Sequence, residues 1–343
     1  MGLFAFKSND IGIDLGTSNI IVTIKGKGIA FREPSVVAID RRTEEIVATG
    51  SEAKEMLGRT PERIKAVRPL KDGVIADFTG AKLLLKNIFK KISGRYKIRK
   101  PRVVVGVPSG ITEVEERAVE EAIMQAGARE VFLIEEPLAA AIGSGMHIEE
   151  PTGNMIIDIG GGTTEVAVIS LGGIVVYNSQ RVAGDELDED IIDYMRKKEN
   201  LSIGKTTAEE IKENIGCATP LISIESMIIR GRDITTGLPR NVEINSNQVL
   251  DALQESLKKI VNTVKATLEK TPPELSADLA ERGIVISGGG ALIKNLDQLL
   301  AKETDMSVYV SNEPLDSVAR GTLKTLEELD RIKSKLKNSR KRR

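Results

Sequence analysis

The chain has 343 residues, of which 41% are hydrophobic and 29% charged, and its formal net charge is −1. This length and balance are typical of a globular protein with a sizeable core, in two domains or one bilobed body. Aromatic residues make up 3% and Trp is absent, which argues against nucleic-acid binding by base stacking. The single cysteine, Cys217, excludes an internal disulfide and fits a reducing cytoplasm. The single histidine, His147, argues against a histidine-based dyad or metal site.

Charge is distributed unevenly along the chain. Residues 331–343 carry 8 basic and no acidic side chains, so the remainder has 41 basic and 50 acidic groups, a net of −9. We expect this tail to be disordered and solvated; the alternative is attraction to anionic lipid, worth about 1 kcal/mol per basic residue near the surface. No run of about 18 uncharged apolar residues appears. The N-terminus turns polar too early for a secretory signal, and Phe6 breaks the myristoylation pattern.

In the first half, β-rich runs alternate with helical patterns. Residues 12–26 predict the start of a β-hairpin, residues 34–39 another strand, and residues 102–108 a buried strand. A helix follows over 111–128, where Thr112 and Glu115 fit a capping box. Residues 131–137 then predict a strand and 137–145 a helix of small residues. This order indicates a sheet with parallel strands and helical cover.

The second half follows the same logic. Three successive strands are predicted from 155–162, 163–171 and 174–182, followed by helical spacing over 185–201 and 206–216. A strand-and-turn region lies near 221–245. A long helix over 247–270 ends at the TPP of 271–273, and residues 283–303 predict a strand, a glycine turn and a helix.

The two halves resemble each other locally. IGIDLGTSNIIVTI aligns with MIIDIGGGTTEVAVI, which places Asp14 on Asp158, 144 residues later. In each, an apolar strand ends in Asp, a glycine turn with hydroxyl residues follows, and a second strand leaves. We infer a duplicated α/β domain with a cleft between the copies.

These turns have the chemistry of phosphate binding. Glycine lets backbone N–H groups approach phosphate oxygens, and Asp14 and Asp158 could hold a hydrated Mg²⁺. A P-loop is excluded because Glu199 stands where the motif before Gly204-Lys205-Thr206 needs glycine, and the Rossmann pattern lacks its third glycine and its helix. A third turn, Ser287 to Gly290, precedes a predicted helix whose N-terminus would favour an anion.

The motifs DLGTSN, VPSGITEVEERA, VFLIEEPLAAAIG, DIGGGTTEVAVIS, TAEEIKENIG, TPPEL and SGGGALI, in this order, resemble those of the MreB/Mbl family of bacterial actin homologues. The resemblance runs from about residue 9 to 330. It implies an actin-like α/β ATPase fold, with two duplicated ribonuclease-H-like domains and four subdomains. The implied segments are 1–145 with a small insertion at about 33–65, 146–314 with an insertion at about 182–246, a return to the first domain over 315–330, and the basic tail 331–343.

The resemblance also implies ATP or ADP with Mg²⁺ as ligands, and slow hydrolysis linked to polymerisation. Glu136 would orient the attacking water with help from Thr163, whereas Glu135 is read as a favourable acid at a helix N-terminus. Asp14 and Asp158 would hold Mg²⁺ through water. The implied nucleotide contacts are Asp14, Gly16, Thr17, Ser18, Asn19, Asp158, Gly160, Gly161, Gly162, Thr163, Glu209, Glu210, Ile211, Lys212, Ser287, Gly288, Gly289, Gly290 and Ala291.

The resemblance further implies paired protofilaments on the inner face of the cytoplasmic membrane, where they would organise lateral cell-wall synthesis with elongation and adaptor proteins. Candidate membrane contacts are Leu3, Phe4 and Phe6, the basic loop 93–101 and the tail 331–343. Two rival functions share the superfamily. An Hsp70-like chaperone is disfavoured because the chain leaves no room for a substrate domain, and a small-molecule kinase because no motif supplies a base for a substrate hydroxyl.

Overall fold

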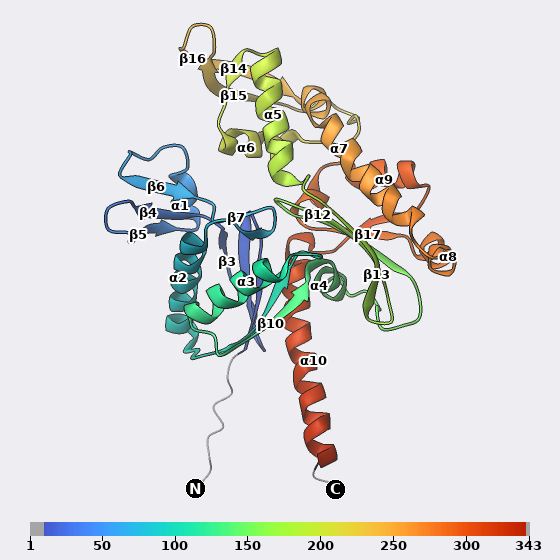
Figure 1. Ribbon diagram of the computed structural model, residues 1–343. Helices are drawn as coiled ribbons and strands as arrows, with labels where there is room; N and C mark the ends of the chain where they lie inside the picture. The colour runs from blue at the N-terminus through green and yellow to red at the C-terminus, as the bar shows by residue number, and fades with distance from the viewer. Residues whose placement is uncertain (1–9, 341–343) are drawn as a thin grey trace. The chain divides into compact units, whose positions relative to one another are not determined.

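The structure is a computed structural model that describes the backbone of residues 10–340 and the side chains of residues 10–328 (Figure 1). Within these residues the chain forms two compact units. The first contains the chain up to Met146 and from Asp316 onward, and the second contains His147–Leu315. The finer division into large and small subdomains stays a prediction.

A five-stranded mixed sheet lies at the centre of the first unit, in the order β10-β9-β1-β2-β3. Strands β1, β2 and β3 are antiparallel neighbours, whereas β1, β9 and β10 run parallel. Every residue of β9 is buried, as expected for a strand that is covered on both faces. The bounds are β1 Ile11–Leu15, β2 Asn19–Ile24, β3 Gly28–Pro34, β9 Arg102–Val107 and β10 Glu130–Glu135.

The helices of this unit include two that touch through their backbones. Helix α10 packs on α4, and a Cβ at Gly143 would lie 1.7 Å from the Ser317 carbonyl oxygen. A Cβ at Gly321 would lie 1.8 Å from the Ala139 carbonyl oxygen. Only glycine permits this close approach. The helices are α2 Phe78–Tyr96, α3 Glu113–Ala126, α4 Glu136–Gly143 and α10 Ser317–Arg340, the last preceded by the 3₁₀ helix η2 Pro314–Asp316.

Local signals in this unit match the predictions at several points. The capping box of α3 is present, since Thr112 and Glu115 each bond to the other's backbone amide. A smaller three-stranded sheet, in the order β5-β4-β6, follows the central hairpin. The remaining elements are β4 Val37–Asp40, β5 Ile46–Thr49, α1 Ser51–Glu55, β6 Ile64–Val67, β7 Leu70–Lys71 and β8 Val74–Ile75.

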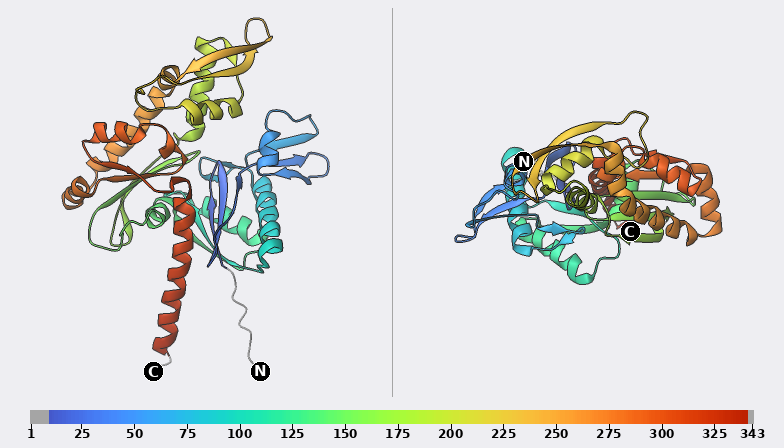
Figure 2. Two further views of the ribbon diagram at one scale, coloured as in Figure 1. Left: turned by 180° about the vertical axis from the view of Figure 1, so that it is seen from behind. Right: turned by 90° about the horizontal axis from the view of Figure 1, so that it is seen from above.

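The backbone of residues 331–340 is helical in this structure, whereas a disordered tail was expected from the sequence. Helix α10 continues to Arg340 and extends beyond the sheet (Figure 2). The stretch from 322 to 343 contains neither Gly nor Pro and is rich in Lys, Leu, Glu and Arg, which favour helix. The side chains of 329–340, residues 341–343 and the N-terminal Leu3, Phe4 and Phe6 lie outside the described part of the chain.

The second unit repeats the sheet of the first. Its order is β13-β12-β11-β17-β18, with β11, β12 and β13 antiparallel and β11, β17 and β18 parallel. Strand β11 corresponds to β1, and both end in the aspartate–glycine turns. The duplication inferred from the sequence is confirmed by this topology. The bounds are β11 Asn154–Ile159, β12 Thr164–Ser170, β13 Gly173–Gln180, β17 Ile284–Ser287 and β18 Val308–Val310.

An aliphatic core joins this sheet to its helices, as expected for a chain with few aromatic residues. The longest helix of the unit, α7, has the capping box Asn245–Gln248 and buries its apolar face. Helix α8, directly after the TPP stop, was not predicted. The helices are α5 Gly184–Lys198, α6 Lys205–Ile215, α7 Ser246–Glu269, α8 Pro273–Arg282 and α9 Leu296–Thr304, and the small sheet contains β14 Leu201–Ser202, β15 Ser226–Asp233 and β16 Pro239–Asn245.

Candidate functional site

The first predicted phosphate turn connects β1 to β2 in the first unit. Its tight path requires glycine, because a Cβ at Gly16 would lie 2.7 Å from the carbonyl oxygen of Asn19. The Ser35 hydroxyl donates to the Gly16 carbonyl at 2.6 Å, and the backbone N–H of Ser35 donates to the Ser18 carbonyl at 2.9 Å. The turn is thus held to the end of β3 by two hydrogen bonds.

Thr17 of this turn is buried, with 4% of its surface exposed. Its hydroxyl oxygen accepts the backbone N–H of Gly73 at 3.0 Å, which links the turn to the β7–β8 hairpin. Because a hydroxyl both accepts and donates, Thr17 keeps a proton to donate. Asn19, the first residue of β2, is exposed.

Glu136 lies close to the end of β1. It is 8% exposed, and its Cγ lies 3.4 Å from the position that a Cβ on Gly106 would occupy. Gly106 of β9 is in register with Asp14 of β1. The structure therefore brings Asp14 and Glu136 to the same edge of the first sheet. Glu135 is the N-cap of α4 and makes no side-chain capping bond.

The second predicted phosphate turn, residues 160–163, connects β11 to β12 in the second unit. The Gly160 N–H donates to the Thr163 carbonyl at 2.9 Å, which closes the turn. Asp158, at the end of β11, is buried and accepts the Ser287 hydroxyl at 2.6 Å. Burial raises the pKa of Asp158 to about 6, and the Ser287 hydrogen bond opposes this rise.

The start of α5 fixes the direction of two peptide groups in this turn. The N–H of Gly184 donates to the Gly160 carbonyl at 3.1 Å, and the N–H of Asp185 donates to the Gly161 carbonyl at 2.7 Å. In a trans peptide the C=O and the following N–H point in opposite directions, and the described residues contain no cis peptide. The N–H groups of Gly161 and Gly162 therefore point away from α5.

Neither of these two N–H groups has a hydrogen-bond acceptor within residues 10–340. Two adjacent backbone donors that point the same way, without side chains beside them, form a concave site for an anion. This is the geometry that a phosphate group requires. The sequence indicated it through the glycines, but the contacts of Gly184 and Asp185 that impose it were missed.

Helix α6 contacts the same region through Lys212. Its ammonium donates to the Gly184 carbonyl at 2.8 Å and pairs with the Asp188 carboxylate at 2.7 Å. Burial raises the pKa of Asp188 to about 6, whereas Lys212 lowers it and the neighbouring Glu209 and Asp185 raise it. Asp188 was not identified in the sequence analysis. Its position four residues after Gly184 places it on the same face of α5 as Gly184, one helical turn later.

One predicted contact on α6 needs correction. The side chain of Ile211 is fully buried in the aliphatic core and cannot reach a ligand. Ala208, Ile211 and Ile215 recur at helical spacing and form the buried face of α6. Glu209 is half-buried near Asp188, and Glu210 is exposed.

The third predicted turn packs directly on the end of β11. A Cβ at Gly288, whose φ is +79°, would lie 2.3 Å from the Ile159 carbonyl oxygen, and a Cβ at Gly290 would lie 2.2 Å from the Ile159 Cγ2. Gly289 is exposed and Ala291 is buried at 4% exposure. The three predicted segments of the second unit, around Asp158, Lys212 and Ser287, are thus brought together.

The expected helix N-terminus at Ser287–Gly290 is wrong. The glycines lead into a short 3₁₀ helix, η1 Gly289–Leu292, and α9 begins only at Leu296, after Asn295. Gly288 and Gly290 pack closely on Ile159 at this point of the chain. No α-helix begins at these glycines.

The carboxylates of Asp14 and Asp158 are ligands of the kind that Mg²⁺ prefers, although they do not form a complete metal site. Among residues 10–328 no group of three or more Asp, Glu, His or Cys side chains is placed to hold a metal. Mg²⁺ usually keeps several waters and takes only one or two carboxylates together with the phosphates of its substrate, so its binding does not require such a group. In the described part of the chain, no helix combines the length and apolarity that crossing a bilayer requires.

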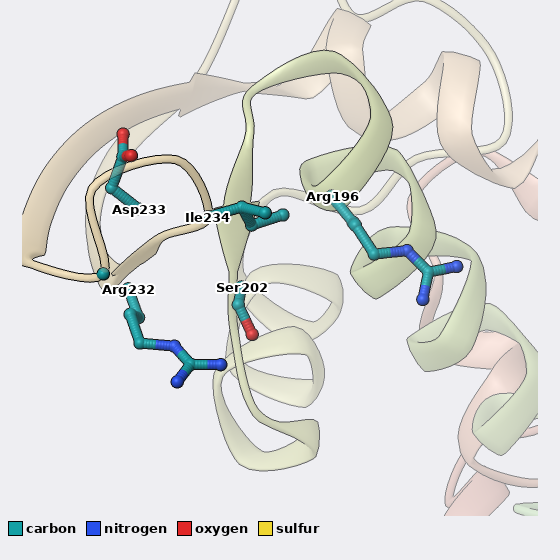
Figure 3. Close-up of a pocket in the computed structure, with 6 residues that line it drawn as sticks. Arg196, Ser202, Arg232, Asp233 and Ile234 are labelled. Atoms are coloured by element: carbon teal, nitrogen blue, oxygen red, sulfur yellow. The ribbon is translucent and has the colours of Figure 1, made fainter.

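A separate cavity lies on the small sheet of the second unit. Its volume is about 340 Å³, and Figure 3 shows the Arg232 side chain extending on the side of the Ser202 hydroxyl while the Asp233 carboxylate points away. Ser202 and Arg232 face each other across the β14–β15 pair. The lining, which comprises Arg196, Ser202, Arg232, Asp233, Ile234 and Gly237, contains none of the predicted nucleotide contacts.

Comparison with known proteins gives one consistent result. The sequence pattern of the MreB/Mbl protein family matches residues 8–334. The cell shape-determining protein MreB of Escherichia coli is 52% identical over 328 residues, which is 94% of each chain. The cell shape-determining protein Mbl of Bacillus subtilis is 49% identical over 325 residues, or 95% of this chain and 98% of that protein.

A solved structure agrees with these relatives. MreB5 of Spiroplasma citri, crystallised with ADP, is 40% identical and superposes with a TM-score of 0.91 over 97% of this chain and 99% of that one. The same protein has also been crystallised with AMPPNP. Together with the duplicated sheets and paired aspartate–glycine turns, these matches establish an actin-like fold, and the chain belongs to the MreB/Mbl family.

Proposed function

We propose that this chain is a cell shape-determining cytoskeletal ATPase that binds ATP with Mg²⁺ and assembles into filaments. The observation that carries the nucleotide part is the pair of N–H groups on Gly161 and Gly162, fixed by α5 and left without an acceptor in the described chain. The MreB5 structures with ADP and AMPPNP support the proposal, because this chain is similar to that protein over nearly its whole length.

Each group of residues then has a defined task. The N–H groups of the second turn bind phosphate oxygens, and the Thr17 hydroxyl donates to a phosphate oxygen from the first turn. Asp14 and Asp158 would hold Mg²⁺ through water, and the cation would supply charge neutralisation for phosphoryl transfer. Glu136 and Thr163 orient the attacking water. The polar groups of α6, Glu209 and Lys212, lie on the side of the adenosine.

The nucleotide proposal is tested by titration with a fluorescent ATP analogue and Mg²⁺. Gly161→Ala and Gly162→Ala place methyl groups beside the two N–H donors and should each weaken binding by about tenfold or more, as loss of one charge-assisted hydrogen bond would. Gly173→Ala is the matched control, because a Cβ there meets nothing within 4 Å. Unchanged binding by both turn variants would contradict the proposed phosphate contact.

We further propose that the filaments lie on an anionic membrane. The segment 93–101, predicted as a loop, begins with the last turn of α2 and supports this through charge rather than insertion. Ile98 is 3% exposed and packs in the core, so it is not available to lipid. Tyr96 is covered by two cations, Lys27 at 4.7 Å and Arg95 at 5.4 Å from the ring centroid. Exposed basic groups remain at Lys27, Arg95, Lys97, Arg99 and Lys100.

The assembly proposal is tested by sedimentation and electron microscopy of the purified chain. With ATP and Mg²⁺ it should pellet as filaments, and anionic liposomes should co-sediment with them. Neutral liposomes should not, because electrostatic attraction requires anionic lipid. A chain that binds ATP but stays monomeric under every condition would remove the filament part of the proposal and leave the nucleotide part.

A further inference from the structure

The contact between α5 and α6 contains a nearly buried ion pair. The Asp188 side chain is 3% exposed and the Lys212 side chain 14%, with 2.7 Å between the carboxylate oxygen and Nζ. Removing two charges from water is costly, and apolar residues would hold two helices together at least as well. Leu187 and Ile191 already bury against the core on this side of α5. The pair is therefore poorly explained as a stabilising contact alone.

The ammonium of Lys212 connects this pair to the phosphate turn. Besides Asp188 it donates to the Gly184 carbonyl at 2.8 Å, and the Gly184 N–H in turn donates to the Gly160 carbonyl at 3.1 Å. That carbonyl determines where the Gly161 N–H points. Moving Lys212 would shift Gly184 and with it the direction of a proposed phosphate donor.

The same pair fixes the position of α6. Glu209, one turn before Lys212, lies close enough to Asp188 to raise the pKa of that carboxyl. The Lys212 ammonium thus forms an ion pair with the Asp188 carboxylate and also donates to the Gly184 carbonyl. Asp188 therefore holds a side chain that contacts the first residue of α5, next to the phosphate turn.

We propose that Asp188 is a positioning residue for nucleotide binding, which acts by holding Lys212 between α6 and the start of α5. It does not touch the nucleotide itself. This inference rests on the proposed function, and it adds a residue that is not among the predicted nucleotide contacts. Without the Asp188 carboxylate, Lys212 loses the ion pair that holds its side chain. The Gly184 peptide group at the start of α5 is then oriented less well toward the phosphate turn.

The test compares ADP–Mg²⁺ affinity of the full chain, by calorimetric titration, with four variants. Asp188→Asn and Lys212→Met should each weaken binding about 10- to 100-fold, the loss expected for one charge-assisted hydrogen bond. The double variant should lose little more than the worse single variant, because the two residues act as a unit. Lys212→Arg should recover part of the affinity, since it keeps a cation at the pair.

Asp190→Asn is the matched control. Asp190 lies on the same helix, and burial also raises the pKa of its carboxyl, but it faces Ser256 of α7 instead of α6. This variant should bind ADP as the wild type does. A general packing role for acids on α5 would instead make the two asparagine variants alike in both affinity and melting temperature.

A pH series supplies a readout that a packing role would not move. The groups around Asp188 are Lys212 and Glu209 from α6 and Asp185 from α5, and Lys205 approaches Asp185 at 3.6 Å. As the pH falls through about 6, Asp188 takes up a proton and the affinity ratio of wild type to Asp188→Asn should fall toward one. A ratio of one at pH about 7.5 would overturn the inference. Failure of the wild type to bind ADP or ATP would overturn the proposed function instead.

Discussion

Ser287 donates its hydroxyl proton to Asp158 at 2.6 Å, across the parallel pair of β11 and β17. Both side chains are buried, and they are in register on adjacent strands. The hydrogen bond holds the carboxylate at the point where β11 ends and the phosphate turn begins. Two motifs that are 129 residues apart in the chain thus form one local structure.

Removing this hydrogen bond should destabilise the second unit. Ser287→Ala leaves the buried Asp158 carboxylate without its hydroxyl donor, at a cost of about 1–3 kcal/mol in the free energy of unfolding. Urea unfolding followed by circular dichroism measures the change. Ser226→Ala is the control, because its hydroxyl bonds Glu243 at 2.7 Å on the exposed surface. Equal losses in the two variants would show that burial does not strengthen the Ser287 contact.

Gly288 should tolerate no side chain. Its φ is +79°, and a Cβ there would lie 2.3 Å from a backbone oxygen of Ile159. Gly288→Ala should therefore cost about 3 kcal/mol or more in unfolding free energy, from strain and steric overlap together. Gly172→Ala separates the two effects, since Gly172 has φ +74° in open space and should lose only about 1 kcal/mol. Similar losses at both positions would mean that the turn relaxes away from β11.

Glu136→Gln should abolish phosphate release while ATP binding stays within about twofold of the wild type. The amide keeps the shape of the side chain but cannot accept a proton or orient water as a carboxylate does, and loss of such a group typically costs about 10²–10⁴ in rate. A phosphate-release assay with a parallel binding titration measures both. Glu135→Gln should retain activity, because Glu135 lies at the helix N-cap. Loss of binding and release together in Glu136→Gln would assign Glu136 to folding.

Asp188 should give the second unit a distinctive pH dependence. Its pKa in the folded chain, about 6, lies above the unfolded value of about 3.9, so the folded state binds the proton more tightly. The stability of the wild type relative to Asp188→Asn should therefore rise as the pH falls, by about 2 kcal/mol between pH about 7.5 and about 4.5. Urea unfolding of both chains across this range measures the difference. A constant difference would mean that Asp188 has an ordinary pKa.

Charge reversal at the basic loop should weaken binding to anionic liposomes. Lys97→Glu with Arg99→Glu and Lys100→Glu should reduce co-sedimentation, with about 1 kcal/mol lost for each cation near the surface. The effect should diminish at high salt because the attraction is screened. The control reverses three exposed cations of the second unit, through Lys197→Glu, Lys198→Glu and Lys302→Glu. Truncation after Asp330 tests the basic tail in the same assay. If the charge-reversal variant and the truncated chain both bind liposomes as the wild type does, the attraction to lipid must be sought in residues 1–9.

Much of this molecule follows from its local sequence. Alternating strand and helix patterns, the capping box at Thr112 and the repeat that relates Asp14 to Asp158 determine the element order and the duplicated sheets. They do so because periodicity, capping and turn chemistry act over a few residues. Glycines next to aspartate and threonine likewise indicated the turns at which we propose that phosphate binds.

The tertiary structure decided what those residues contact. Sequence alone could not show that Gly184 and Asp185 orient the phosphate turn, that Asp188 holds Lys212, or that Ile98 and Ile211 are buried. It also placed an α-helix N-terminus at Ser287–Gly290, where the glycines pack on Ile159 and lead into a short 3₁₀ helix. These features depend on contacts between segments that are distant along the chain, and no local pattern encodes which partner a side chain will meet when the sheets and helices pack.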